Sequence, residues 1–160
     1  MRGQSLRPGA IRGTAVPSSG RLSGYRDRPL GPERRVVETP AALAAIRAAY
    51  IREFNVGNVD AVMGLHTAAT IHLPSGRPPI VGQTDVRDLM LESLRSAPGG
   101  FRFHFEPVGL RLGGDLAVEW GVTPGAAGFP GGKYIMVYER DRDGCWRIAW
   151  TMSNLDGPSG

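Results

Sequence analysis

Apolar residues recur at helical spacing in three parts of the chain. In the first part they follow Thr39-Pro40, a threonine cap with proline at the first helical position, and predict a helix that stops at Asn55-Val56-Gly57. A short second helix is predicted with Asp60 as its cap and His66 at its end, where a positive charge suits the helix dipole. A third helix is predicted to begin at Thr84. The apolar stripes of these helices are Leu43, Ile46, Tyr50 and Phe54; Val62, Met63 and Leu65; and Val86, Leu89, Met90 and Leu94.

The rest of the domain is predicted to form β-strands, and in one stretch apolar residues alternate with polar ones. A short strand is predicted over residues 70–74, and phenylalanines at 101, 103 and 105 predict another. Tight turns are predicted at residues 113–115 and 141–144, and they delimit three long strands over residues 116–122, 133–140 and 145–154. Helices followed by a meander of strands predict an α+β domain, with a curved antiparallel sheet wrapped on three N-terminal helices.

Charge divides the chain near residue 39. The 160 residues carry a net charge of +4, and the sequence pI is about 9.8. Residues 1–38 hold eight arginines, three acidic residues, six glycines and four prolines, whereas residues 39–160 hold 11 basic and 12 acidic residues. We therefore predict a disordered leader over residues 1–38 and one folded domain over residues 39–160. The basicity belongs to the leader, which argues against nucleic acid as a partner of the domain.

Missing patterns exclude several classes of protein. No apolar run approaches the ~20 residues of a membrane helix, and no secretory apolar stretch of ~7–15 residues precedes residue 39, so a cytoplasmic protein is predicted. A single cysteine, Cys145, excludes an internal disulfide and a cysteine-based zinc site. The three histidines lack the close spacing of metal ligands, so no metal site is predicted. Nucleophile-elbow, phosphate-loop and dinucleotide motifs are also missing.

Three stretches of the sequence together resemble one protein superfamily. They are residues 50–62 (YIREFNVGNVDAV), residues 69–82 (ATIHLPSGRPPIVG) and residues 143–148 (DGCWRI) of the closing hairpin. In these stretches the chain resembles the ketosteroid isomerase and SnoaL-like polyketide cyclase superfamily, over roughly residues 41–156. The resemblance implies the cone-shaped α+β fold of that superfamily, the nuclear transport factor-like fold. It implies less about activity, because this fold carries many functions.

The resemblance also implies where an active site would lie. Steroid isomerases of this type use a tyrosine in the first helix and a protonated aspartate on a late strand as hydrogen-bond donors, with an aspartate before the proline of the first strand as the base. These positions match Tyr50, Met136 and Leu73 of this chain. Since leucine and methionine carry no proton, ordinary ketosteroid isomerisation is not expected, and Leu73 and Met136 are predicted to contact the ligand instead.

Three residues are candidates for acid–base chemistry, and each has a structural alternative. Tyr50 is either a hydrogen-bond donor in a cavity or a packed core aromatic. His72 is either a replacement general base or a histidine on the far surface of the sheet, because neighbours along a strand point to opposite faces. Glu119 is an acid or base if it faces the cavity, and a solvated carboxylate if it faces out.

Aromatic and polar residues of the late strands predict a binding pocket. Five alternating residues of the last strand are expected to share one face: Trp146, Ile148, Trp150, Met152 and Asn154. Trp120, Trp150 and Met152 would line a pocket for a flat apolar ligand, and Asn154 would supply a polar anchor. The alternative is that these side chains pack against the helices or bury a dimer interface.

These residues lead to two hypotheses of function. In the first, the protein is an isomerase, cyclase or dehydratase that acts on a hydrophobic, oxygenated molecule of the polyketide, steroid or terpenoid kind. Its acid–base chemistry needs no cofactor: Tyr50 donates to a developing oxyanion, and His72 or Glu119 moves the proton. In the second, it is a non-catalytic ligand-binding or dimeric interaction module of the same fold that has lost the catalytic carboxylates. The resemblance also implies a homodimer formed through the open sheet face.

Overall fold

Three helices and one six-stranded sheet make up the described part of the chain, residues 38–97, 99, 102–125 and 130–157 of a computed structural model. The strand order in the sheet is β2-β1-β6-β5-β4-β3, and the predicted α+β class is confirmed. Apart from Glu38, the predicted leader lies outside the described residues. The elements in chain order are α1 (Glu38–Asn55), α2 (Val59–Met63), β1 (His66–Leu73), β2 (Ile80–Val81), α3 (Gln83–Ser96), β3 (Glu106–Gly113), β4 (Leu116–Thr123), β5 (Gly132–Arg140) and β6 (Trp146–Leu155).

The sheet is mixed, not antiparallel as predicted. β1 runs parallel to β6, while the other neighbouring strands are antiparallel. The prediction of three N-terminal helices is also wrong for the third helix. α3 follows β1 and β2 along the chain, and only α1 and α2 precede the sheet. A meander pairs strands that are adjacent in sequence, and so it does not reveal that β1 pairs with the last strand.

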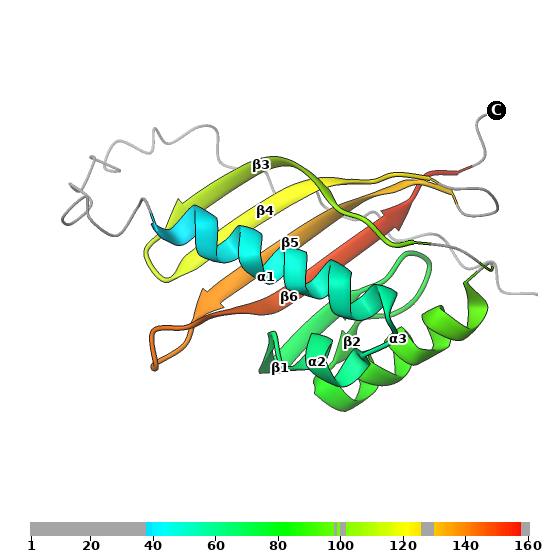
Figure 1. Cartoon of the computed structure of the whole chain (residues 1–160), viewed down its shortest axis with the longest axis horizontal. Helices are drawn as coiled ribbons and strands as arrows, with labels where there is room; N and C mark the ends of the chain where they lie inside the picture. The colour runs from blue at the N-terminus through cyan, green and yellow to red at the C-terminus, as the bar shows by residue number, and fades with distance from the viewer. Residues whose placement is uncertain (1–37, 98, 100–101, 126–129, 158–160) are drawn as a thin grey trace, which may run out of the picture. The chain divides into compact units, whose positions relative to one another are not determined.

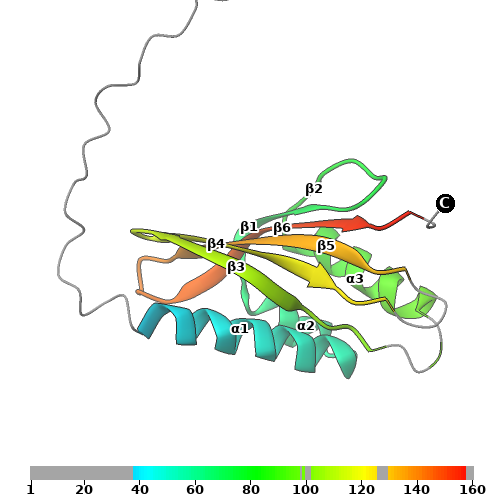
Figure 2. The ribbon, with the colours of Figure 1, turned by 90° about the horizontal axis from the view of Figure 1, so that it is seen from above.

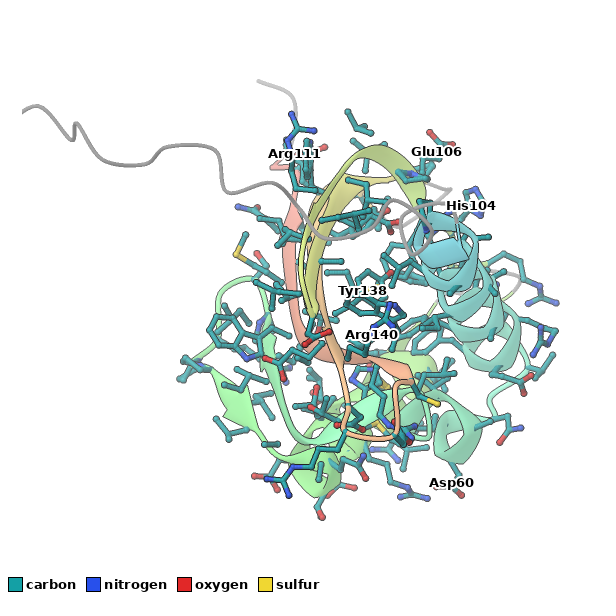
Figure 3. The ribbon with its side chains drawn as sticks, turned by 90° about the vertical axis from the view of Figure 1, so that its left-hand side faces the viewer. Asp60, His104, Glu106, Arg111, Tyr138 and Arg140 are labelled. Carbon is teal, nitrogen blue, oxygen red and sulfur yellow. The ribbon has the colours of Figure 1, made fainter. Side chains whose placement is uncertain are left out.

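One face of the sheet packs against α1 and forms the core. α1 crosses in front of the long strands in Figure 1, and Figure 2 shows it lying along one side of the sheet. Burial alternates along β4 and β5, as expected of strands with one face toward a core. Tyr138 of β5 points into the space between the sheet and α1, whereas Arg111 of β3 points to the opposite side (Figure 3). The core joins Leu43, Tyr50 and Phe54 of α1 to Tyr134, Met136 and Tyr138 of β5.

The helix starts differ from prediction by one or two residues. α2 is capped by Asn58, whose side chain accepts a hydrogen bond from the backbone N–H of Ala61 at 3.3 Å, and Asp60 lies in its first turn. α3 is preceded by Gly82 in a left-handed backbone conformation (φ +93°), so Thr84 lies inside the helix. Several polar residues near one helix start satisfy the same capping rule, and the sequence alone does not choose between them. None of the described helices is both long enough and apolar enough to cross a membrane.

The phenylalanine-rich segment before β3 is not a strand. The strand begins only at Glu106, and Phe101 lies outside the described residues. Asn55 at the end of α1 bonds both backbone groups of Phe103: its Nδ2 donates to the carbonyl at 2.8 Å, and its Oδ1 accepts from the N–H at 2.7 Å. A side chain therefore satisfies the backbone that a neighbouring strand would otherwise pair, and Phe103 and Phe105 pack against the core.

A bulge in β6 exchanges the two faces of that strand. Ile148 pairs with Tyr138 and Trp150 pairs with Val137, which leaves Ala149 as an extra residue. Ile148 and Ala149 are both buried, whereas Trp150 is 49% exposed. The predicted single face of five alternating residues is therefore wrong. The alternation is broken between Ile148 and Trp150, and one unpaired residue changes the side to which every later side chain points.

Candidate functional site

A mostly apolar cavity of about 350 Å³, open to solvent at one end, lies between the helices and the inner face of the sheet. Helix α1 contributes two aromatic residues, the segment before β3 two more, and α3 a valine and a methionine. These apolar walls are Tyr50, Phe54, Val86, Met90, Phe103 and Phe105. A cavity of this size and lining suits a small organic molecule.

One row of residues across the sheet brings the polar groups to this cavity. His72 of β1 lies opposite Thr151 of β6, Thr151 lies opposite Met136 of β5, and Met136 lies opposite Glu119 of β4. Residues directly opposite each other share a face of the sheet. His72, Thr151 and Met136 line the cavity, while Glu119 lies at the far end of the row and outside it. Of the two alternatives for His72, the structure therefore has the inward-facing one.

His72 is held as a neutral imidazole by burial and by Thr151. Its Nδ1 lies 2.5 Å from the Thr151 hydroxyl oxygen. Burial lowers the pKa of His72 to about 4, so that the ring carries no charge at neutral pH. A threonine hydroxyl can donate or accept, and either tautomer of the ring can therefore be held in the same place. The arrangement can take up a proton and give it back.

Tyr50 presents a phenol to the same cavity. Its ring packs near Phe54, Phe103 and Phe105, with centroids 5.4–6.1 Å apart. Burial raises the pKa of Tyr50, so the hydroxyl stays protonated at any physiological pH. Within the described residues this hydroxyl has no hydrogen-bond partner. Tyr50 is thus a core aromatic whose O–H is able to donate to an oxygen in the cavity.

Glu119 faces inward, but its carboxylate is already bound by two other side chains. It forms an ion pair with Arg47 of α1, and it accepts a hydrogen bond from the Tyr134 hydroxyl at 3.0 Å. The expectation of a solvated carboxylate is wrong, because Glu119 is 2% exposed. The expectation of a carboxylate on the cavity wall does not hold either. Burial and the negative charge of Glu119 raise the pKa of Tyr134, which does line the cavity.

His66 differs from its predicted place and charge. It is the first residue of β1, not the end of the second helix, and its side chain is buried. Its Nδ1 lies 2.9 Å from the hydroxyl oxygen of Thr70. Burial, with a smaller effect of His72, lowers the pKa of His66 to about 4. Instead of a cation at a helix end, His66 is a neutral ring packed 6.0 Å from the ring of Tyr50.

Three of the predicted ligand contacts lie outside the cavity. Leu73 is the strand neighbour of His72 and points to the outer face of the sheet. Trp120 packs on the same outer face against Gly109, where a Cβ would lie only 2.1 Å from the ring, and the guanidinium of Arg111 lies 5.5 Å from its centroid. Trp150 is turned outward by the bulge. The other predicted contacts do border the cavity: Met136, Met152 and Asn154.

The sequence interpretation missed Thr151 as the partner of His72, because that contact depends on the parallel pairing of β1 with β6. It also missed an ion pair between Arg77, in the loop after β1, and Glu92 of α3, both of which border the cavity. Arg77 belongs to a stretch that resembles the superfamily, but nothing in the sequence connects it to Glu92. Among the residues that the structure describes, no group of three or more His, Cys, Asp or Glu is arranged to hold a metal.

The fold of this chain also occurs in solved structures of other proteins. No family model matches the sequence, and no curated protein matches it. Solved structures do match: a ketosteroid isomerase-like protein from Erwinia carotovora atroseptica (22% identity, TM-score 0.61) covers 74% of this chain and 96% of its own. An NTF2-like protein with a cystatin-like fold from Novosphingobium aromaticivorans (17% identity, TM-score 0.65) covers 79% and 87%. A candidate dehydratase of the NTF2-like family from Streptomyces avermitilis (12% identity, TM-score 0.60) covers 75% and 97%. The chain therefore has the fold of the NTF2-like and ketosteroid isomerase-like proteins.

Proposed function

We propose that the protein is an isomerase, cyclase or dehydratase that acts on a small, hydrophobic carbonyl compound by acid–base chemistry without a cofactor. The observation that carries the proposal is that a neutral histidine and a protonated tyrosine border the same apolar cavity. Similarity to a candidate dehydratase, and to proteins named after ketosteroid isomerase, is in keeping with it.

In the proposed reaction the two side chains act on adjacent atoms of the substrate. His72 removes a proton from the carbon next to the carbonyl group, and the C–H electron pair forms the double bond of an enolate. Tyr50 donates a hydrogen bond to the enolate oxygen as negative charge develops there. The imidazolium of His72 then returns the proton to another carbon, or to a departing hydroxyl group. A base with a pKa of about 4 favours substrates whose α-hydrogen is acidified by conjugation.

Exchange of the α-hydrogens of 2-tetralone for deuterium in D₂O, followed by NMR, tests this proposal. Each of Tyr50→Phe and His72→Gln is expected to slow the enzymatic exchange about 10²-fold or more. The controls are Tyr138→Phe and His104→Gln, which alter a buried tyrosine and an exposed histidine that do not border the cavity. The wild-type rate should fall only as the pH drops toward 4, because protonated His72 accepts no proton. An exchange rate in His72→Gln equal to that of His104→Gln would remove the proposed base.

A second candidate function is a non-catalytic ligand-binding module, and two observations favour it. The position of the usual base is held by Leu73, which faces away from the cavity, and the inward-facing carboxylate of Glu119 is already paired with Arg47. Binding of 2-tetralone without any exchange above the solvent rate would support this alternative over the enzyme.

The outer face of the sheet supports a homodimer as the proposed assembly. We define the outer apolar face as Ile71, Leu73, Val118, Trp120, Val137 and Trp150. Ile71, Trp150, Val137 and Val118 lie opposite one another in one row across four strands. Contiguous apolar surface of this kind marks interaction sites in soluble proteins, and a second copy of the chain offers a surface of matching chemistry.

A further inference from the structure

We propose that Arg77 makes the cavity selective for ligands that carry a carboxylate, and that Glu92 occupies Arg77 until such a ligand replaces it. The inference rests on the proposed role of the cavity as a small-molecule site, and it names the chemical class of the ligand: an apolar body with an acidic group at the cavity mouth.

The geometry of the Arg77–Glu92 pair is that of carboxylate recognition. Nη1 of Arg77 donates to Oε2 of Glu92 at 2.8 Å, and Nη2 donates to Oε1 at 2.8 Å. A planar guanidinium that donates two parallel hydrogen bonds binds a carboxylate with defined orientation, which a lysine would not do. The carboxylate of Glu92 thus stands where the carboxylate of a ligand would bind.

The pair lies at the boundary between the cavity and solvent. Both residues border the cavity, yet the side chain of Arg77 is 51% exposed and that of Glu92 is 48% exposed. No other Arg, Lys, Asp or Glu occurs among the described residues that line the cavity. Since the remaining wall is mostly apolar, a bound molecule has one place on the described wall where an ionised group meets a fixed charge.

Exchange of the two carboxylates costs little. The equilibrium between the paired and the separated state of an exposed ion pair favours the pair by a factor of at most about five. A ligand whose apolar body is buried in the cavity presents its carboxylate at a high effective concentration beside Arg77, while Glu92 can turn into water. The nearby hydroxyls of Ser93 and Ser96 donate to carbonyl groups of their own helix, so they do not hold Glu92 in place.

A matched pair of fluorescent ligands tests the inference: 2-naphthylacetate and its neutral analogue 2-naphthylacetamide, titrated against the whole chain. Arg77→Gln is expected to weaken binding of the acid about tenfold or more and to change binding of the amide less than twofold. Glu92→Gln is expected to tighten binding of the acid about two- to fivefold, because the competing carboxylate is gone. Arg87→Gln is the control, since Arg87 of α3 forms an exposed ion pair with Asp60 of α2 but does not border the cavity.

The outcomes separate this inference from the function on which it rests. If the amide binds and Arg77→Gln leaves the ratio of acid to amide affinity unchanged, Arg77 does not select the ligand. If Glu92→Gln weakens binding of the acid, Glu92 supports the site and does not compete for it. If neither ligand binds the wild-type protein, the small-molecule role of the cavity fails, and the selectivity fails with it. Thermal melting of each variant checks that these exposed substitutions leave the fold intact.

Discussion

At the scale of single residues, two buried histidines are kept neutral, and one of them, His72, borders the cavity. His66 and His72 both lie on β1, and each has its Nδ1 next to a threonine hydroxyl. Burial lowers the pKa of each ring to about 4. Because an imidazolium would lose most of its hydration here, the folded protein resists protonation that the unfolded chain accepts readily.

This difference predicts that the protein loses stability in mild acid. Between the ordinary histidine pKa of about 6.5 and the folded value of about 4, the unfolded chain binds more protons than the folded one. Stability is therefore complete above about pH 6.5, and each histidine is expected to remove about 2–3 kcal/mol of it by pH 4. Urea unfolding between pH 7 and pH 4 measures the loss.

The variant His66→Gln tests whether His66 contributes to this loss of stability in acid. It removes one of the two proton-binding rings, so its free energy of unfolding should depend less steeply on pH than that of the wild type. His104→Gln removes an exposed histidine and should keep the wild-type dependence. Identical pH dependences for the wild type and His66→Gln would show that His66 does not bind a proton on unfolding in this range.

The roles of individual residues were predictable only in part. Tyr50 could be placed near a cavity, because the helical stripe and the resemblance to steroid isomerases both include it. The orientation of His72 could not be predicted, since the irregular register between β1 and β6 decides which face of the sheet it occupies. Glu119 was predicted to face either solvent or the cavity, whereas it pairs with Arg47. The two residues are 72 positions apart in sequence, so no local pattern connects them.

At the scale of elements, the buried Arg47–Glu119 pair joins α1 to β4. The Tyr134 hydroxyl extends this contact to β5. Glu119→Gln is expected to lower the free energy of unfolding by about 3 kcal/mol, because it leaves the largely buried Arg47 without its counter-charge. Glu139→Gln is the matched control on an exposed position of β5, and it should change stability by less than about 0.5 kcal/mol.

A double variant distinguishes the ion pair from simple packing. Combined Arg47→Met and Glu119→Gln should be less destabilised than the sum of the two single variants, because no charge is then left unpaired. Additive losses in urea unfolding would contradict a direct coupling between α1 and β4 through these side chains.

The elements themselves followed from the sequence better than their pairing did. The three helices and the long strands lie close to their predicted ranges, because spacing and turn residues are local signals. The parallel pairing of β1 with β6 and the bulge at Ala149 are contacts between distant segments, which local patterns do not contain. These two features decide that His72 faces the cavity and that Trp150 does not.

At the scale of the described domain, the sheet has two apolar faces but only one set of helices. The inner face is covered by helices and holds the cavity. The outer apolar face contains three residues that were predicted to contact a ligand: Leu73 from the resemblance to steroid isomerases, and Trp120 and Trp150 as aromatic residues of the late strands. These side chains are apolar, as expected of ligand contacts, but they lie on the face of the sheet away from the cavity. A second copy of the chain is the proposed partner of this face.

A charge on the outer apolar face should therefore separate the proposed dimer. Trp150→Lys puts a positive charge on a side chain that is 49% exposed, at a position that does not border the cavity. The wild-type protein is expected to sediment as a dimer and Trp150→Lys as a monomer at the same concentration. Val56→Lys, which alters an exposed valine just after α1, is the control and should sediment like the wild type. A wild-type protein that sediments as a monomer would contradict the dimer and leave the outer apolar face to a different partner. If Trp150→Lys becomes monomeric but still binds 2-naphthylacetamide, assembly and ligand binding belong to opposite faces of one sheet.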